Sequence, residues 1–134
     1  MKDTILLNRP RGFRGSGVVL KDDMILLMRQ VFKGEDFYNI PGGAWEKGET
    51  LEETCKREVK EEFNIEIKKI ELLTTYTLDG EFAGSYSIFT SKLASPISQI
   101  QCNEGQKAEF FSPQDALKVG LPNKTSTWLL KKYL

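Results

Sequence analysis

Residues 43–65 read GAWEKGETLEETCKREVKEEFNI and carry acidic side chains at positions 46, 49, 52, 53, 58, 61 and 62, out of nineteen in the whole chain. Thr50, followed three positions later by Glu53, forms a capping box, which is the pattern that begins a helix. Because no Gly or Pro interrupts residues 49–63, we predict a helix over residues 51–63. The sequence therefore predicts a glycine-rich turn that leads directly into a charged helix.

The predicted helix has one apolar face. At about 100° of rotation per residue, the residues expected to face the core are Leu51, Cys55, Val59 and Phe63. The residues expected to face solvent are Glu53, Lys56 and Lys60. The arc between the two faces carries Arg57, Glu58, Glu61 and Glu62, of which Glu58 and Glu62 lean toward the apolar side. Acidic side chains are therefore expected close to the core.

This clustering of carboxylates needs a compensating charge. Glu58 and Glu62 are a like-charged pair one helical turn apart, which costs about 0.2–0.5 kcal/mol when exposed and more when partly buried. Arg57 can offset one charge, and the lysines lie on the wrong face to pair with the two glutamates. A divalent ion such as Mg²⁺, which prefers carboxylate oxygens and shares its shell with phosphates, could offset the rest. A solvated helix with Glu–Lys pairs is the alternative.

These residues resemble the signature of the Nudix (MutT-type) hydrolases, G-x5-E-x7-R-E-U-x-E-E-x-G-U, in which U is a bulky aliphatic residue. The positions that match are Gly43, Glu49, Arg57, Glu58, Val59, Glu61, Glu62 and Ile65. Asn64 stands where the family has glycine. Asn adopts the left-handed conformation more readily than other non-glycine residues, so we expect a small stability cost and little effect on chemistry.

The resemblance implies an Mg²⁺-dependent hydrolase, with Mn²⁺ as a possible substitute, that cleaves the pyrophosphate linkage of a nucleoside diphosphate derivative. It implies that the metal ligands are Glu58, Glu61, Glu62 and the backbone carbonyl of Gly43. Glu58 or a loop carboxylate would also act as general base, and Arg57 would hold the carboxylates through a salt bridge to Glu49. Glu104 lies in a polar loop where some members of the family supply a further ligand or base.

Substrate choice rests on weaker markers. ADP-ribose-type members of the family tend to carry a proline after the signature, where this chain has Glu81. Pro122-Asn123 before a terminal helix resembles the tail of MutT-type nucleoside triphosphatases, in which an Asn reads a purine edge, although a plain helix start explains the same residues. We therefore favour a (d)NTP pyrophosphohydrolase that gives a nucleoside monophosphate and pyrophosphate. The alternatives are an ADP-ribose or nucleotide-sugar pyrophosphatase and a non-catalytic nucleotide sensor, against which the complete glutamate set argues.

Three further side chains are candidates for substrate binding, each with a structural alternative. Arg29, like Arg14, could flank a phosphate or could be a solvated charge at a strand end. Trp45 lies in the glycine-rich loop and could pack on the substrate or cover the loop. Tyr86, together with Tyr76 and Phe89, could form a wall for base stacking or could pack in the core.

The remainder of the chain alternates predicted strands with turn signals. A short edge strand or arm is expected over residues 1–10, and strands over residues 17–20, 24–28, 37–40, 65–78 (with a bulge near Lys68-Lys69), 83–93 and 107–111. A polar loop is expected over residues 31–36 and another over 94–105. Ser112 before Pro113 predicts a helix over residues 113–119, and a terminal helix follows over residues 126–134. This pattern predicts an α/β/α sandwich with a mixed central sheet, which agrees with the fold that the resemblance implies.

Composition is that of an ordinary globular protein. The chain has 134 residues, 40% of them hydrophobic and 28% charged, with a net charge of zero, and we expect a single domain over residues 1–134. A neutral surface gives no support to binding of a nucleic-acid polymer or a membrane, so we expect a small nucleotide as partner, a cytoplasmic location, and a monomer or homodimer. The chain has no His, so acid–base chemistry must fall to carboxylates, Lys, Tyr, Cys or metal-bound water.

Overall fold

The computed structural model describes residues 12–80, 83–103, 106–121 and 124–132. The arm predicted over residues 1–10, the candidate base Glu104 and the candidate base-reading residue Asn123 lie outside the described residues. Among the described helices, none is long and apolar enough to cross a membrane.

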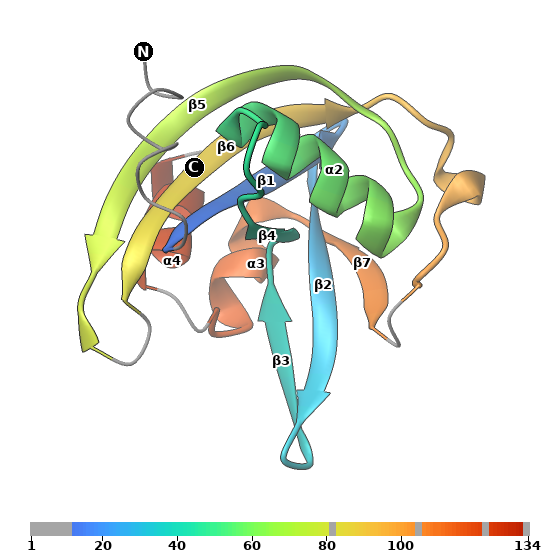
Figure 1. Ribbon diagram of the computed structural model, residues 1–134. Helices are drawn as coiled ribbons and strands as arrows, with labels where there is room; N and C mark the ends of the chain where they lie inside the picture. The colour runs from blue at the N-terminus through green and yellow to red at the C-terminus, as the bar shows by residue number, and fades with distance from the viewer. Residues whose placement is uncertain (1–11, 81–82, 104–105, 122–123, 133–134) are drawn as a thin grey trace.

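A mixed sheet forms the middle of the molecule (Figure 1). Its strands are β1 (Phe13–Lys21), β2 (Met24–Phe32), β3 (Glu35–Asn39), β4 (Gly42–Ala44), β5 (Ile67–Leu78), β6 (Gly84–Leu93) and β7 (Lys107–Phe111). The order along the sheet is β3-β2-β1-β6-β5, with β4 paired to β1 and β7 paired to β2. Strands β1 and β6 run parallel, with Phe13 opposite Ser85 and Leu20 opposite Lys92, and the other pairs are antiparallel. The mixed sheet predicted from the sequence is therefore confirmed.

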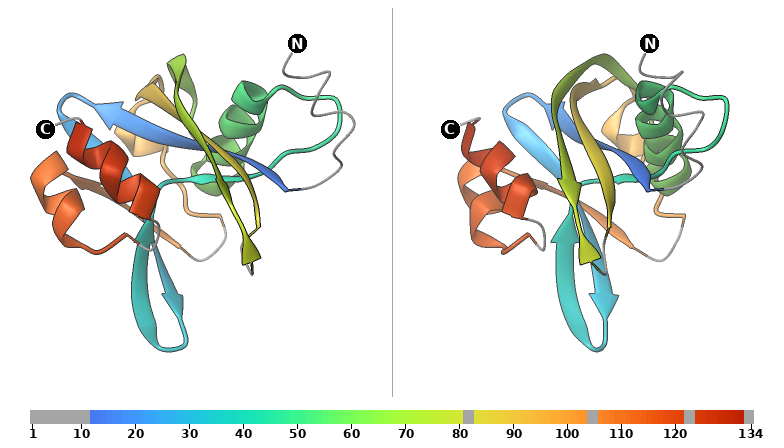
Figure 2. Two further views of the ribbon diagram at one scale, coloured as in Figure 1. Left: turned by 90° about the vertical axis from the view of Figure 1, so that its left-hand side faces the viewer. Right: turned by 60° about the vertical axis from the view of Figure 1, so that its left-hand side comes forward.

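Helices cover the sheet on both sides, as Figure 2 shows. Helix α2 (Leu51–Phe63) packs on one face, whereas α3 (Pro113–Lys118) and α4 (Lys124–Lys132) pack on the other. A short 3-10 helix, η2 (Ile97–Gln99), lies in the loop between β6 and β7. The three layers are those of the predicted α/β/α sandwich.

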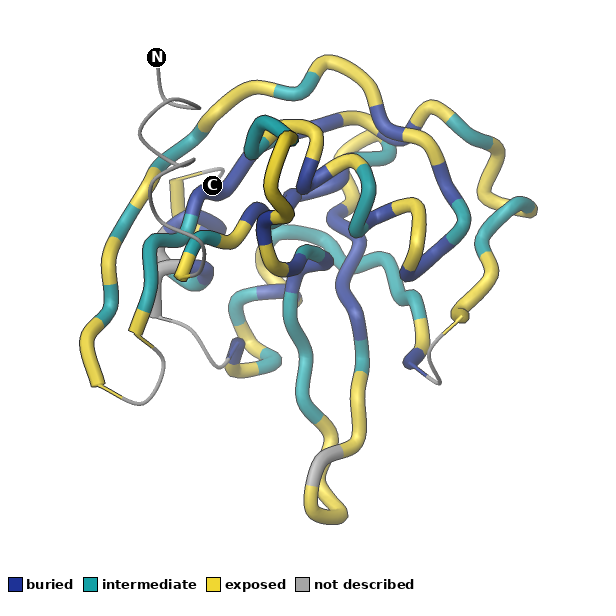
Figure 3. Tube along the Cα trace, viewed as in Figure 1, coloured by how far each residue is buried: buried dark blue, intermediate teal, exposed yellow. Residues whose placement is uncertain are grey.

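The two faces of the sheet have separate cores. Val19 and Leu26 pack with α2 on one face, and Val18 and Leu27 pack with α3 and α4 on the other. Successive side chains of a strand point to opposite faces, so the continuous apolar runs of β1 and β2 are needed because both faces are covered. Figure 3 shows that the buried residues concentrate where β1, β2 and α2 meet.

Helix α2 begins and ends as its sequence predicts. Thr50 and Glu53 form the predicted capping box, and Asn64 ends the helix in the left-handed conformation, with φ 59° and ψ 33°. The apolar face is buried, and burial raises the pKa of the Cys55 thiol to about 12. The helix lies very close to β1, because a Cβ added at Gly15 would stand 2.8 Å from the Leu51 carbonyl oxygen. Glycine at this position therefore lets the helix approach the sheet.

The predicted loop over residues 31–36 is wrong. Strand β2 continues to Phe32 and β3 begins at Glu35, joined by Lys33 and Gly34, which both have positive φ angles of 53° and 79°. This is the geometry of a tight two-residue hairpin turn. The ribbon extends away from the body of the molecule (Figure 1), and Val31 is 70% exposed. Because neither face of this ribbon is buried, its sequence does not alternate between apolar and polar residues, and residues 31–36 therefore resemble a loop.

The predicted bulge in β5 is confirmed. The register between β5 and β6 shifts between Lys68 and Glu71, and Lys69 has a positive φ of 52°. Strand β7 has the predicted bounds. Helix α3 also begins where predicted, since the Ser112 hydroxyl caps it by accepting a hydrogen bond from the Asp115 N–H at 3.2 Å.

Candidate active site

Arg57 lies at the centre of a carboxylate cluster on α2. Its Nε and Nη2 donate to Glu49 Oε2 and Oε1 at 3.0 and 2.8 Å, a two-point contact that only a guanidinium can make. Its Nη1 donates to Glu58 Oε2 at 2.8 Å and to Glu61 at 3.3 Å. Nη2 also donates to the Ala44 carbonyl at 2.8 Å. The guanidinium therefore joins the glycine-rich loop to the acidic face of the helix, and the expected contact with Glu49 is present.

The electrostatics of the pair are strongly coupled. The Arg57 hydrogen bonds lower the pKa of Glu49 to about 2, although its partial burial opposes this, and the Thr54 hydroxyl and the Glu46 N–H contribute further donors. In turn, the hydrogen bond to Glu49 raises the pKa of Arg57 above its usual range. Both groups are therefore charged at neutral pH.

The turn between β3 and α2 brings backbone close to the carboxylates. Glu62, which is 5% exposed, accepts a hydrogen bond at its Oε1 from the Gly42 N–H at 3.0 Å. A Cβ added at Gly43 would collide with the Glu58 carboxyl group, and one added at Gly42 would collide with Ser16. Both glycines are therefore needed for this close approach, and Glu58 and Glu62 are directed at the turn rather than into solvent.

The residues fit a hard divalent ion in donor type. Carboxylate oxygens from Glu58, Glu61 and Glu62 and the carbonyl of Gly43 are the ligands that Mg²⁺ prefers. Within the described part of the chain, however, no three acidic or sulfur-bearing side chains converge closely enough to hold an ion. The reason is that Glu58 and Glu61 point to Arg57 and Glu62 points to Gly42. The Glu61 side chain is 50% exposed and has room to turn.

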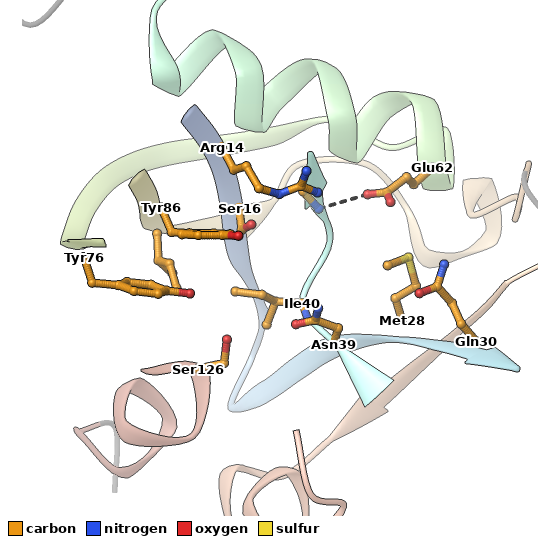
Figure 4. Close-up of a pocket in the computed structure, with 12 residues that line it drawn as sticks. Arg14, Ser16, Met28, Gln30, Asn39, Ile40, Glu62, Tyr76, Tyr86 and Ser126 are labelled. Atoms are coloured by element: carbon orange, nitrogen blue, oxygen red, sulfur yellow. Dashed lines mark hydrogen bonds between the residues drawn. The ribbon is translucent and has the colours of Figure 1, made fainter. Parts of the chain in front are cut away.

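A polar pocket of about 220 Å³ opens beside Gly42 and Glu62. Figure 4 shows residues of its walls, which include Arg14 and Ser16 of β1, Asn39 of β3, Tyr76 of β5, Tyr86 of β6 and Ser126 of α4. The rings of Tyr76 and Tyr86 are stacked, with centroids 5.1 Å apart and planes at 12°. Asn39 accepts a hydrogen bond from the Ile40 N–H at its Oδ1 at 2.9 Å. The pocket therefore combines a flat aromatic wall with polar groups and a cation.

The structure places the other candidate residues as follows. Tyr86 lines the pocket, and its part in substrate binding stays a prediction. Trp45 is 7% exposed, packs edge-on against Phe13 with ring centroids 6.2 Å apart, and donates from Nε1 to the Glu49 carbonyl at 2.6 Å. These contacts favour the loop-covering role of Trp45 over contact with a substrate.

Arg29 lies away from the pocket. Met28 and Gln30 line the pocket, and the side chain between them on β2 points to the opposite face of the strand. Arg29 pairs there with Asp36 at 3.1 Å and with Glu109 at 3.4 Å. The geometry favours the structural alternative, a paired charge on the strand surface, over a phosphate contact.

Sequence reasoning did not single out Asn39, Ser16 or Ser126, because no local pattern marks them and only the tertiary fold brings them together. It also did not single out Thr54, whose hydroxyl donates to Glu49 Oε1 at 2.8 Å. A signal for Thr54 existed, because a hydroxyl on the buried side of a helix needs a partner.

The sandwich fold and the carboxylate helix define the class of protein. A family model described as NUDIX domain matches residues 13–130, and the chain belongs to the Nudix family. It is a hydrolase that acts on phosphoanhydrides of nucleotides.

Similar proteins agree with this class. The chain is 42% identical over 123 residues to the ADP-ribose pyrophosphatase of Methanocaldococcus jannaschii, a match that covers 88% of this chain and 70% of that protein. A segment of 57 residues is 39% identical to the NAD-capped RNA hydrolase NudC of an Enterobacter species, which covers 42% of this chain and 22% of NudC. The NUDIX hydrolase from Nitrosomonas europaea shares the fold with a TM-score of 0.77, at 23% identity, over 92% of this chain and 69% of that chain.

Proposed function

We propose that this Nudix hydrolase cleaves the pyrophosphate linkage of a nucleoside diphosphate derivative in an Mg²⁺-dependent reaction, with ADP-ribose as the first candidate substrate. The observation that carries the proposal is the position of Glu58 and Glu62 against the Gly42-Gly43 turn, beside a pocket with an aromatic wall. A substrate whose nucleoside occupied the pocket would extend its phosphates toward these carboxylates.

The pocket suits a nucleoside better than a larger group. A volume of about 220 Å³ accommodates a nucleobase and part of its ribose. The stacked rings of Tyr76 and Tyr86 form an aromatic wall against which a base can pack, and Asn39 adds a polar amide to the lining. Arg14 and Glu62 both line the pocket (Figure 4), and the charge of Arg14 favours a phosphate.

The carboxylates have two roles in this proposal. Glu58, Glu61, Glu62 and the Gly43 carbonyl would hold divalent ions, which when bound neutralise phosphate oxygens and acidify water. Glu58 would also accept the proton of the attacking water as general base, and Arg57 holds its carboxylate at 2.8 Å. The water oxygen forms a new bond to one phosphorus atom as the bond from that phosphorus to the bridging oxygen breaks. The products of ADP-ribose are AMP and ribose 5-phosphate.

The choice of ADP-ribose rests on the 42% identity with a protein named for that activity. A (d)NTP pyrophosphohydrolase is the second candidate, because Glu81 stands where ADP-ribose-type members tend to carry proline and Pro122-Asn123 resembles the tail of MutT-type enzymes. Glu104 stays a prediction as a further ligand or base. The zero net charge supports a small nucleotide rather than a nucleic-acid polymer as partner.

One substrate screen tests the proposal. Purified protein with Mg²⁺ would be assayed against ADP-ribose, nucleotide sugars, NTPs and dNTPs, with products identified by chromatography. Glu61→Gln and Glu62→Gln serve as controls that keep side-chain size and remove charge. AMP and ribose 5-phosphate as the preferred products support the first candidate, and a nucleoside monophosphate with pyrophosphate supports the second. No turnover of any substrate, or turnover unchanged in both variants, would remove the proposed function.

A further inference from the structure

We propose that Thr54 is a positioning residue of the active site: its hydroxyl holds Glu49, and through Glu49 it holds Arg57 and the carboxylate of Glu58. The kinetic consequence of this inference rests on the proposed function, whereas its structural consequence does not.

The Thr54 hydroxyl proton goes to Glu49. Thr54 is fully buried, and its Oγ1 lies 2.8 Å from Glu49 Oε1 and 3.1 Å from the Thr50 carbonyl oxygen. A hydroxyl has one proton to donate. The Thr50 carbonyl already accepts the Thr54 N–H at 2.9 Å, as in any helix. The carboxylate is closer and charged, so it is the stronger acceptor.

Packing alone does not require a hydroxyl at this position. A Cβ added at Gly15 would lie 3.3 Å from the Thr54 Cβ, so β1 limits the size of the side chain but not its polarity. Threonine is a mediocre helix former, and a buried hydroxyl is unfavourable unless it has a partner. What the hydroxyl adds at this site is its bond to Glu49.

This bond ties a loop side chain to the helix. Glu49 Oε1 accepts from three donors: the Thr54 hydroxyl at 2.8 Å, the Glu46 N–H at 2.9 Å and Arg57 Nη2 at 2.8 Å. Glu46 belongs to the same loop as Glu49 and moves with it, so Thr54 is the neutral donor that is fixed to α2. A fixed Glu49 orients the two guanidinium nitrogens that contact it, Nε and Nη2 of Arg57. The third nitrogen, Nη1, is then directed at Glu58.

The test compares Thr54→Val, which keeps the shape and removes the hydroxyl, with Thr54→Ser, which keeps the hydroxyl. Ser91→Ala is the matched control, because it removes a buried hydroxyl that donates to the Val18 carbonyl at 3.3 Å. The first readout is the ¹⁵N NMR signal of the Arg57 Nε–H in metal-free protein, assigned by its loss in Arg57→Lys. The second is the dissociation constant for Mn²⁺, and the third is the separate change of kcat and KM on the preferred substrate of the proposed screen.

We expect the Arg57 Nε–H signal to lose its protection from solvent exchange in Thr54→Val and to keep it in Thr54→Ser and Ser91→Ala. Mn²⁺ binding should weaken about fivefold and kcat should fall about tenfold in Thr54→Val, with KM little changed, because the charges remain but their geometry loosens. Thr54→Ser should restore all three.

An Arg57 signal and an Mn²⁺ affinity in Thr54→Val equal to those of the unmodified protein would overturn the inference. Equal loss of the Arg57 signal and of Mn²⁺ affinity in Thr54→Val and Thr54→Ser would also overturn the inference, since the shape of the side chain and not its hydroxyl would then matter. If Thr54→Val folds poorly, Thr54→Ala against Thr54→Ser gives the same comparison. The NMR readout needs neither metal nor substrate, so a protein inactive on every nucleotide would remove the proposed function and leave this test intact.

Discussion

Replacing Glu49 by Gln should destabilise the protein by about 3 kcal/mol at neutral pH. The carboxylate has its pKa lowered from 4.5 to about 2, chiefly by the Arg57 hydrogen bonds. At about 1.4 kcal/mol per pKa unit, this difference corresponds to about 3 kcal/mol of preference of the folded state for the charged form. The Glu49 side chain is 16% exposed and that of Arg57 22%, so solvent screens the pair only in part.

The pH dependence has a definite sign. Because folding lowers the pKa of Glu49, its contribution is fully present above about pH 4.5, the value expected when unfolded, and is lost as the pH falls toward 2. Glu49→Gln has no proton to bind at this position. The difference in unfolding free energy between the two proteins should therefore be constant from neutral pH down to about 5 and should shrink below it.

Urea unfolding followed by circular dichroism between pH 2.5 and 7 would measure this difference, with the slope on urea compared to verify that both proteins unfold alike. Glu66→Gln is a matched control just beyond the end of α2, since it breaks a half-exposed pair with Lys60 at 2.9 Å and should cost less than about 1 kcal/mol. The reasoning is refuted if Glu49→Gln is as stable as the unmodified protein at pH 7, or if the difference persists undiminished at the acid end.

Four further outcomes are expected from steady-state kinetics and thermal unfolding. Gly43→Ala should lower kcat by about 100-fold, because its methyl group would displace the Glu58 carboxyl group, and an unfolded variant would show as a lost melting transition. Tyr86→Ala should raise KM about tenfold with kcat nearly unchanged, because it removes the stacking surface; an unchanged KM would place the base elsewhere. Arg29→Ala should leave KM within about twofold, since its partners are Asp36 and Glu109, and a large rise would return it to the substrate. Chelation with EDTA should abolish hydrolysis, added Mg²⁺ should restore it, and the melting temperature should increase with Mg²⁺ concentration; full activity in EDTA would exclude the proposed metal dependence.

The parts of the fold that the sequence predicts are those with local signals. The bounds of α2 follow from the Thr50–Glu53 capping box and from Asn64, which are read within a few residues of each other. The bulge at Lys69 and the start of α3 after Ser112 are local in the same way. The salt bridge between Arg57 and Glu49 was expected from the resemblance to a family rather than from helix geometry, because Glu49 lies before the helix.

Most of the polar pocket could not be predicted, since its walls come from strands and helices far apart in the chain. Asn39 and Ser126 have no neighbours in sequence that mark them as binding residues, and only the packing of α4 against the sheet brings Ser126 to the cavity. The salt bridge between Arg29 and Asp36 could not be predicted for a different reason. Their strands leave the body of the protein as an exposed ribbon, so the hairpin turn at Lys33-Gly34 was the one signal available.

The parallel pairing of β1 with β6 has a consequence for how the enzyme reaches its active form. Residues 13–20 pair with residues 85–92, and α2 belongs to the long segment that this pairing closes. Such distant contacts form late, because the chain entropy of closure must be lost before the pairing stabilises the product. A chain in which β1 has not yet paired with β6 therefore lacks the pocket that Arg14 and Ser16 of β1 form with Tyr86 of β6.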